Sequence, residues 1–365
     1  MGRLTSKLNA KLILENGDIY WGKSFGFEKN GNGEVVFSTG MVGYPESLTD
    51  PSYKGQILAL TFPLIGNYGI PNENHTVDIS DNFESSNIQV QGLIVSDYSR
   101  DYHHWSAERS LEDWLIEQKI TALTEVDTRS LTRQIREKGV MLGKIIVNQD
   151  DDPGFYDPNL ENLVAQVSTK KVKSYGNGKH KITVIDCGMK NNILRMLLKH
   201  DVTVKRVPWN YDVLQDDFDG LFISNGPGDP KMCQETIKII QNALSLNKPI
   251  FGICLGHQLL ALAAGGSTYK LRYGHRSQNQ PCLGTNNACF ITAQNHGYAV
   301  DMSSLSSDWR ELFQNINDKT NEGIEHVSKP FFSVQFHPEG FGGPQDTNFL
   351  FDKFLGLVEE NGKDA

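Results

Sequence analysis

Cysteine is scarce in this chain of 365 residues. The only cysteines are Cys187, Cys233, Cys254, Cys282 and Cys289, and none forms a Cys-x-x-Cys pair or a Cys/His cluster with zinc-ligand spacing. So few scattered thiols, odd in number, argue against a disulfide framework and favour a reducing compartment. We therefore expect a cytoplasmic protein with no metal site.

An excess of positive charge is also absent. Lysine and arginine total 35 against 44 aspartates and glutamates, a formal net charge of -9, which argues against nucleic acid or an anionic membrane surface as the main partner. The segment 249–269 carries no charged residue, but its glycines, histidine and glutamine indicate buried soluble structure rather than a membrane span. The first residues lack the apolar segment of a secretory signal.

The length and composition are those of an ordinary globular protein of about two domains. Residues 1–150 predict an α+β domain. It begins with a hairpin on a type I′ turn at Asn16-Gly17, and contains a helix around Leu111–Gln118 capped by Ser106 and a second helix between Asp127 and Gly139. The polar stretch 151–180 is typical of a linker.

Residues 181–360 alternate short apolar strands with helices. This alternation predicts an α/β domain with a mostly parallel, doubly wound sheet. Ligands of such sheets bind at the carboxyl ends of the strands, and the three motifs described next follow predicted strands.

The first motif is Gly252-Ile-Cys-Leu-Gly256, between a buried strand and a helix. It has the form of a nucleophile elbow with cysteine in place of serine. A tight strand-to-helix turn exposes the thiol at a helix N-terminus, where backbone N–H groups favour a thiolate and stabilise an oxyanion. The alternative is a buried structural cysteine, the common fate of free cysteines and the one expected for the other four.

The second motif, His337-Pro-Glu339, follows an apolar strand. A histidine can act as the base for Cys254, and a carboxylate two residues later can orient it. The alternative is a surface loop in which a histidine stands beside an exposed glutamate. The third motif is the loop from Asn225 to Pro230, whose rigid backbone could complete the oxyanion hole or be a plain turn.

In this order, the motifs NGPGDP, GICLGHQLL and FHPE resemble the class I (triad) glutamine amidotransferase family. Residues 38–72 and 126–139, and later 291–301 and 315–326, are similar to the small subunit of carbamoyl phosphate synthetase, in its eukaryotic glutamine-dependent type. The resemblance extends over nearly the whole chain. Thiol-type α/β-hydrolases share the elbow, but they place the acid before the histidine, whereas Glu339 follows His337.

The resemblance implies a glutaminase in which Cys254 attacks the glutamine carboxamide. His337 would shuttle the proton, Glu339 would orient His337, and the backbone N–H groups of Leu255 and Gly226 would bind the oxyanion. The implied glutamine-binding residues are Ser52, Gly226, Leu255, Gln258, Asn295, Gly297 and Tyr298. Two positions depart from the family pattern, because Ser277 replaces a usual glycine and Tyr298 a common phenylalanine.

The resemblance also implies a partner, either a synthetase large subunit or a fused synthetase domain. The partner would receive ammonia and would hold ATP, magnesium and bicarbonate, so that this chain needs no cofactor. We expect the product to feed pyrimidine synthesis, with an arginine-pathway subunit as the alternative. A catalytically idle regulatory subunit and another amidotransferase, such as an anthranilate or guanylate synthetase component, are further alternatives. The first 150 residues argue against the last of these.

Overall fold

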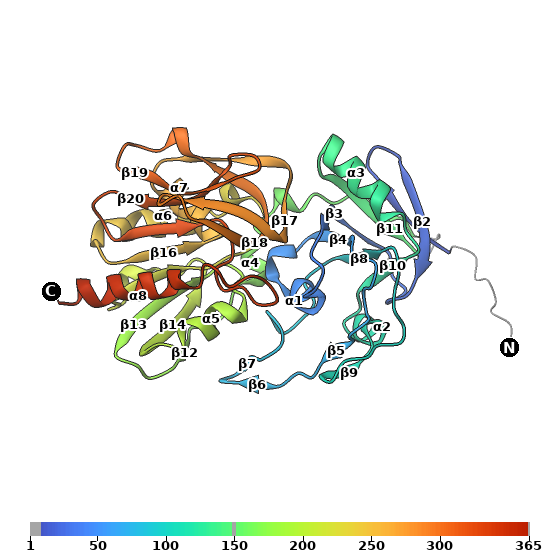
Figure 1. The fold of residues 1–365 in the computed structure, drawn as a ribbon, viewed down its shortest axis with the longest axis horizontal. Coiled ribbons are helices and arrows are strands. Elements are labelled where there is room, and N and C mark those ends of the chain that lie inside the picture. Colours follow the sequence, from blue (N-terminus) through green and yellow to red (C-terminus); the bar gives the residue numbers. More distant parts are fainter. Residues whose placement is uncertain (1–8, 148–150, 364–365) are drawn as a thin grey trace. The chain divides into compact units, whose positions relative to one another are not determined.

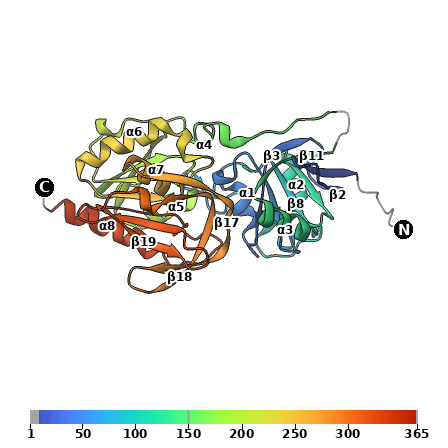
Figure 2. The same cartoon turned by 90° about the horizontal axis from the view of Figure 1, so that it is seen from above.

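The structure is a computed structural model that describes residues 9–147 and 151–363. The chain divides into two compact units, residues 1–158 and 159–365. The first residues, where a secretory signal was judged absent, lie outside the described part. Figures 1 and 2 show the elements of each unit.

The first unit is built on a closed barrel of seven strands in the order β1-β11-β3-β4-β8-β10-β2. β3, β4, β8 and β10 run parallel, while β1, β2 and β11 pair antiparallel. The barrel strands are β1 (Ala10–Leu14), β2 (Ile19–Ser24), β3 (Gly31–Ser38), β4 (Gln56–Leu60), β8 (Gly92–Val95), β10 (Thr121–Thr124) and β11 (Met141–Ile146). Outside it lie α1 (Tyr44–Thr49), α2 (Leu111–Glu117) and α3 (Thr128–Lys138), the pair β5 (Ile70–Pro71) with β9 (Ala107–Arg109), and the pair β6 (His75–Thr76) with β7 (Ile79–Ser80).

Two local predictions for this unit need correction. The hairpin of β1 and β2 forms, but only Gly17 of its turn has a positive φ (90°), whereas a type I′ turn needs two such residues. The bonds from Leu14 N to Asp18 O and from Gly17 N to Leu14 O instead close a three-residue loop. The cap of α2 is Ser110, which accepts a hydrogen bond from Asp113 N, because the residues after Ser106 form β9. Asp127 and Gly139 do bound α3 as expected.

The second unit contains a sheet of ten strands in the order β12-β14-β13-β15-β16-β21-β20-β19-β17-β18. Its strands are β12 (Lys173–Tyr175), β13 (His180–Asp186), β14 (Val202–Pro208), β15 (Gly220–Ile223), β16 (Ile250–Ile253), β17 (Ser267–Gly284), β18 (Cys289–Asp301), β19 (Trp309–Asn315), β20 (Asn321–His326) and β21 (Phe331–Val334). Only β14, β13, β15, β16 and β21 are mutually parallel. The other strands pair antiparallel, so the expectation of a mostly parallel sheet holds for the central part alone.

Helices cover both faces of the parallel strands, as a doubly wound sheet requires (Figures 1 and 2). Leu221 and Ile223 of β15 pack in a core cluster with α6 (Gln234–Ala243) and α7 (Leu255–Ala263). Phe222, between them, points to the other face, where it contacts Phe351 and Phe354 of α8 (Phe349–Asn361). The remaining helices are α4 (Val164–Val167) and α5 (Asn191–Leu197).

The expected linker 151–180 is a structural part of the second unit from residue 159 onward. β12 pairs with β14, with Lys173 opposite Arg206. Thr169 N donates to the buried Asp186 carboxylate (2.8 Å), which also binds Arg206 Nε (2.7 Å). Polar composition indicated a linker because β12 has a largely exposed edge-strand sequence.

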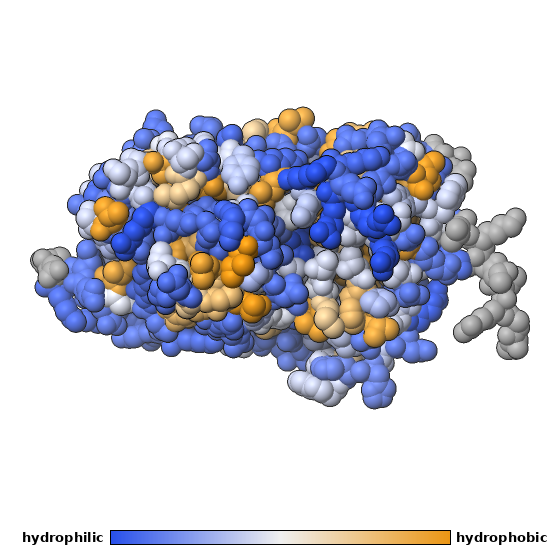
Figure 3. All heavy atoms as spheres, turned by 45° about the horizontal axis from the view of Figure 1, so that its top comes forward, coloured by the Kyte–Doolittle hydropathy of each residue, from blue (hydrophilic) through white to orange (hydrophobic). Residues whose placement is uncertain are grey.

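Hydrophobic residues appear as scattered spots among hydrophilic ones on the face shown in Figure 3. Among the described residues, no helix combines the length and apolar character needed to cross a bilayer.

Candidate active site

Cys254 lies between the end of β16 and the start of α7, in a strained backbone conformation with φ 54° and ψ -102°. Its N–H donates to Val334 O of β21 (2.8 Å), and its carbonyl accepts from His257 N and Gln258 N of the first helical turn. Strand pairing on one side and helix bonds on the other therefore hold the thiol at the turn. The backbone turn is the elbow that the motif predicted, but the expected exposure of the thiol is wrong, because only 2% of Cys254 is exposed.

The glycines of the elbow are required by close backbone approach. A Cβ atom on Gly256 would lie 2.2 Å from Ile223 O, and one on Gly252 would lie 2.6 Å from Gly256 O. Any side chain at either position would push α7 away from β15 and β16. The spacing of the motif thus reflects how tightly the helix starts against the sheet.

His337 and Glu339 follow β21, the strand beside β16. His337 Nδ1 donates to Glu339 Oε1 (2.7 Å), and both side chains are almost completely buried. The same carboxylate oxygen accepts from Lys190 Nζ at 2.9 Å. Lys190 lies between β13 and α5, and no sequence motif marks it.

Charge neighbours set the protonation of this group. Burial raises the pKa of a carboxyl group, but Lys190 and His337 outweigh it and hold the pKa of Glu339 at about 2. Burial likewise opposes charge on His337, yet Glu339 and the Cys254 thiol raise the pKa of His337 to about 10. Among the described residues His337 Nε2 has no hydrogen-bond partner, so Glu339 fixes Nδ1 and leaves Nε2 available.

A chain of side-chain amides reaches the sulfur from the other direction. Gln335 Nε2 donates to Cys254 Sγ (3.6 Å), and Gln335 Oε1 accepts from Gln258 Nε2 (2.9 Å). Gln258 Nε2 also donates to Tyr298 O (3.0 Å), while the thiol itself donates to Asn295 O of β18 (3.7 Å). Gln335 is a second contact residue that no sequence motif marks.

Two backbone donors remain available near the elbow. Neither Leu255 N, at the start of α7, nor Gly226 N, after β15, has an acceptor among the described residues. The loop that carries Gly226 is fixed by Lys190 N, which donates to Asn225 Oδ1 (3.1 Å). A Cβ on Gly226 would lie 2.1 Å from Cys187 O, so the loop tolerates only glycine there.

The second unit therefore contains nine of the ten residues expected at the site. Direct contacts join Cys254, Asn295, Gln258 and Tyr298, and separately His337 and Glu339. Gly226 lies next to Leu255, since a Cβ on it would meet the Leu255 side chain, and Gly297 stands between Asn295 and Tyr298 in β18. The tenth residue is Ser52, which is buried in the first unit with its N–H bound to Asp50 Oδ1 (2.9 Å).

The two departures from the family pattern fit the local structure. Ser277 lies in β17 opposite Gln294, and it is not among the residues with positive φ, so this position does not need glycine. The Tyr298 hydroxyl donates to Asn159 Oδ1 (3.1 Å).

The other cysteines differ from Cys254 in their surroundings. Burial raises the pKa of Cys233 to about 12 and places the pKa of Cys187 and Cys282 well above the usual thiol value. These three thiols are therefore neutral at physiological pH. Cys289 is exposed at the start of β18.

Two protein families match the chain, one in each unit. Residues 12–145 match "Carbamoyl-phosphate synthase small chain, CPSase domain", and residues 183–357 match "Glutamine amidotransferase class-I".

Full-length relatives cover both matched regions. The arginine-specific small chain of carbamoyl phosphate synthase from Neurospora crassa is 49% identical over 361 residues, which cover 96% of this chain and 80% of that protein. The multifunctional protein CAD of Squalus acanthias is 53% identical over 95% of this chain, but this is 16% of that protein. The human mitochondrial "Carbamoyl-phosphate synthase [ammonia]" is 50% identical over 96% of this chain and 24% of that protein. The chain thus spans less than a quarter of these two long relatives.

Proposed function

Because this chain belongs to the carbamoyl-phosphate synthase small-chain family and contains a class-I glutamine amidotransferase domain, we propose that it hydrolyses glutamine and delivers ammonia to a carbamoyl-phosphate-forming partner. The observation that supports this most directly is the strained Cys254 elbow beside the buried His337–Glu339 pair. A nucleophile, a base and an orienting carboxylate are the groups that acyl transfer through a thioester needs.

The first half of the reaction releases ammonia. His337 Nε2 already carries the thiol proton, in keeping with the raised pKa of His337, while Cys254 Sγ attacks the carboxamide carbon of glutamine. The N–H groups of Leu255 and Gly226 stabilise the resulting oxyanion. Collapse of this intermediate breaks the C–N bond, and His337 returns the proton to the departing nitrogen, which leaves a glutamyl thioester on Cys254.

The second half regenerates the thiol. His337 Nε2 removes a proton from water, the hydroxide attacks the thioester, and the C–S bond breaks to release glutamate. Glu339 keeps the proton on Nδ1, so that Nε2 faces the reaction in both halves. Lys190 holds Glu339 ionised and in place.

Recognition of glutamine requires partners for an amide, because a site with such partners rejects glutamate. We assign this role to Gln258, Asn295, Gly297 and Tyr298, with Ser52 contributed by the first unit. Gln258 Nε2 is already engaged by Gln335 and by Tyr298 O, so its Oε1 is the atom left to accept from the substrate.

The glutaminase step is tested with the full chain and Cys254→Ala. We expect the variant to lose glutamate release by at least about 10³-fold, the scale seen when a nucleophile is removed. It should also lose covalent labelling by a chloroketone analogue of glutamine, measured by intact mass. The matched control is Cys233→Ala, which removes a buried thiol outside the site and should keep both properties. Full activity in Cys254→Ala contradicts the proposal.

The partner is proposed to be a synthetase large subunit or a fused synthetase domain. ATP, magnesium and bicarbonate are assigned to that partner, so that hydrolysis by this chain proceeds without a cofactor. Glutamine-dependent carbamoyl phosphate formation by the two components together, compared with ammonia-dependent formation by the partner alone, tests this assignment. If this chain hydrolysed glutamine only after a cofactor was added to it, the assignment of all cofactors to the partner would be wrong.

We further propose pyrimidine synthesis as the destination of the product. The supporting observation is that identity is 53% to the multifunctional CAD relative and 49% to the arginine-specific one. Deletion of the gene should create a requirement for uracil that arginine does not relieve. An arginine requirement would assign the chain to the other pathway.

The cytoplasm is the proposed location, because all five cysteines are free, as is usual in a reducing compartment. Imaging of the full-length protein fused to a fluorescent domain tests this. Import into an organelle would contradict it.

A second candidate function is a regulatory subunit that does not hydrolyse glutamine. The name of the human relative, which specifies ammonia, favours it. Glutamate release by wild type and Cys254→Ala distinguishes a glutaminase from a regulatory subunit. The assay must include the partner, since a partner can order the site. Equal carbamoyl phosphate formation by wild type and Cys254→Ala would establish the regulatory function.

A further inference from the structure

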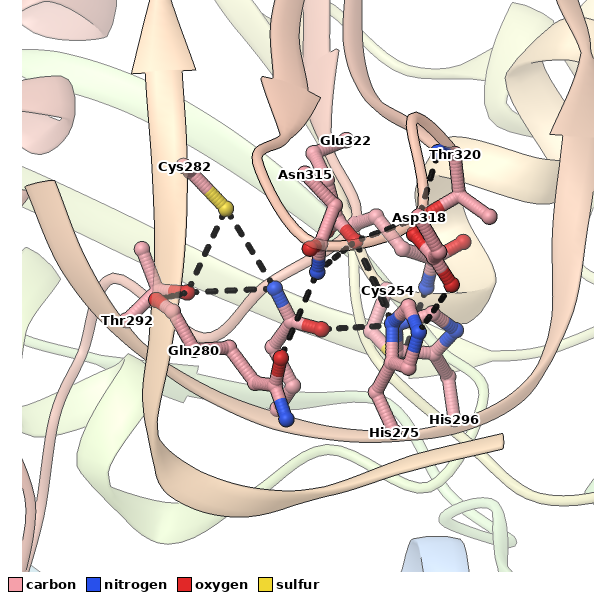
Figure 4. A network of polar contacts seen from close by, with 12 residues as sticks. Cys254, His275, Gln280, Cys282, Thr292, His296, Asn315, Asp318, Thr320 and Glu322 are labelled. Carbon is pink, nitrogen blue, oxygen red and sulfur yellow. Dashed lines mark hydrogen bonds and ion pairs between the residues drawn. The ribbon is translucent and has the colours of Figure 1, made fainter. Parts of the chain in front are cut away.

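Three buried side chains from different strands converge beside β18, as Figure 4 shows. They are His275 of β17, His296 of β18 and Glu322 of β20, and the candidate ligand atoms of the three lie within 4.8 Å of one another. The proposed glutaminase mechanism uses none of them. Burying histidine and glutamate side chains costs free energy unless their polar atoms have partners, so the cluster calls for an explanation.

Hydrogen bonds at the outer nitrogens fix both imidazoles. His275 Nε2 lies 2.8 Å from Asp318 Oδ2, and His296 Nδ1 lies 2.8 Å from Tyr298 O. A carboxylate and a carbonyl can only accept, so each of these nitrogens carries its proton. In a neutral ring the other nitrogen then has a lone pair, and both of these nitrogens face Glu322.

The interior of the cluster has acceptors without matching donors. His275 Nδ1 and Glu322 Oε2 have no hydrogen-bond partner in the described part of the chain. Glu322 Oε1 accepts from Asn315 Nδ2 and Thr320 Oγ1, each at 3.4 Å.

Gln294 adds another acceptor. Its Nε2 donates to Thr292 Oγ1 and Cys282 Sγ, which turns Oε1 toward His296 Nε2 at 3.2 Å. Two acceptors therefore face each other there.

A proton on His275 Nδ1 would give a hydrogen bond to only one acceptor of the cluster, and that bond would be long. His275 Nδ1 is 3.4 Å from Glu322 Oε1, whereas a charge-assisted N–H···O bond is about 2.7–2.9 Å long. The separation instead matches the edge of a tetrahedron whose metal–ligand bonds are about 2.0–2.1 Å, for which ligand atoms lie about 3.3–3.4 Å apart. His296 Nε2 is 3.9 Å from Glu322 Oε1, so it would have to move inward by a few tenths of an ångström.

We propose that His275 Nδ1, His296 Nε2 and the Glu322 carboxylate bind one divalent transition-metal ion of the zinc class. Two imidazoles and one carboxylate are a ligand set that suits zinc, whereas magnesium and calcium prefer oxygen alone. Gln294 Oε1 or a water completes the coordination. Asp318 and Tyr298 O supply the outer hydrogen bonds that metal-bound histidines usually make.

The ion would be structural. It would join β17, β18 and β20 at one point, and His296 directly follows Asn295, whose carbonyl accepts the Cys254 thiol. The ion thereby fixes the segment of β18 that contacts the nucleophile, without touching the reacting atoms. This role is independent of whether glutamine is the substrate.

The test measures metal rather than activity. Full-length protein, freed of any affinity tag and purified without chelator, is analysed by elemental mass spectrometry, and we expect about one zinc per chain. After removal of the metal, added Co²⁺ should give the intense visible absorption of a tetrahedral site. Glu322→Gln and His296→Asn should lose both signals.

Matched controls come from the same strand. Glu325→Gln and His326→Asn change the same residue types in β20, outside the cluster, and should keep both signals. Asp318→Asn should weaken metal affinity by about 10- to 100-fold, the usual cost of losing an outer partner of a ligand. Circular dichroism checks that each variant is folded, and Glu322→Gln alone decides the result if His296→Asn does not fold.

Folded wild-type protein with less than a tenth of an equivalent of metal and no Co²⁺ absorption would overturn the proposal. Equal metal in wild type and Glu322→Gln would overturn it as well. In either case the cluster is a protonated imidazole held between two carboxylates.

Discussion

At the scale of single residues, the charge on Glu339 makes stability depend on pH. Its pKa is lowered to about 2 in the folded chain from 4.5, so its stabilising contribution is complete above pH 4.5 and is lost as the pH falls toward 2. We expect the difference in urea midpoint between wild type and Glu339→Gln to shrink steadily below pH 4.5. A difference that stays constant from pH 6 to pH 3.5 would contradict this assignment.

His337 titrates in the opposite sense. Its pKa is raised to about 10 from 6.5, so the contribution of its charge is complete below pH 6.5 and is lost as the pH rises through 10. The urea midpoint of wild type relative to His337→Asn should therefore fall between pH 7 and pH 10. The pair is most stabilising between pH 4.5 and 6.5, where both groups are charged in the folded chain.

Lys190 is expected to be a positioning residue whose loss strands a buried charge. Lys190→Met should destabilise the chain by about 3–5 kcal/mol, the usual cost of breaking a buried ion pair. It should also lower kcat more than it raises KM, since Lys190 acts through Glu339. Lys181→Met is the control, because the Lys181–Asp217 pair has the same 2.9 Å separation but is exposed to solvent, so its loss should leave the stability nearly unchanged. Equal destabilisation by the two variants would contradict this role.

The residues proposed to react stand in local sequence patterns, whereas the residues that support them in the structure do not. Cys254 stands in a motif whose glycines have a visible steric purpose, and the carboxylate of Glu339 lies two residues from His337. Lys190 is separated from Glu339 by 149 positions, so no local pattern marks it. The same holds for the cluster of His275, His296 and Glu322. These residues come together only across strands, so they show no zinc-ligand spacing along the chain.

At the scale of elements, the start of α7 is held closely against the sheet. Gly256→Ala should displace the helix from β15 and cost about 1–3 kcal/mol through overpacking, with a large loss of glutamine hydrolysis. The control is Gly356→Ala in α8, where a Cβ meets no atom within 4 Å and helix propensity gains up to about 1 kcal/mol. Denaturation midpoints and glutamate release measure both effects. A Gly256→Ala variant with wild-type values would contradict this account of the motif.

Buried apolar runs made the parallel strands and their helices predictable, whereas the antiparallel half of the sheet was not recognised. β17 and β18 are long and half exposed, and their polar residues read as loops. The pair Asn16-Gly17 predicted a type I′ turn, but the loop that forms needs a positive φ only at Gly17. At α2 the nearer serine, Ser110, is the cap.

At the scale of the whole molecule, the division near residue 158 can be tested by truncation. A fragment that begins at residue 159 should fold with a higher thermal midpoint than one that begins at residue 181. The shorter fragment lacks β12 and the Thr169 bond to Asp186, which leaves the edge of β14 unpaired. If the two fragments had equal thermal midpoints, residues 159–180 would act as a linker and not as part of the second unit.

The first unit is proposed to contribute much of the contact with the partner. Trp105 is 92% exposed, and exposed tryptophans are frequent anchors of interfaces. Trp105→Asp should weaken partner binding by about tenfold or more, and should uncouple glutamine use from carbamoyl phosphate formation while glutamine binding is kept. Leu160→Asp, an equally drastic change at an exposed position of the second unit, is the control. Retained coupling in Trp105→Asp would contradict the proposal.

The position of β21 in the sheet has a consequence for how the protein is made. β21 lies between β16 and β20, and it is the last strand among the described residues. A ribosome therefore releases Cys254 about 80 residues before His337, and Cys254 lacks the Val334 bond that holds its backbone until β21 inserts. The proposed reaction thus becomes possible only late in synthesis, after β21 has joined the sheet.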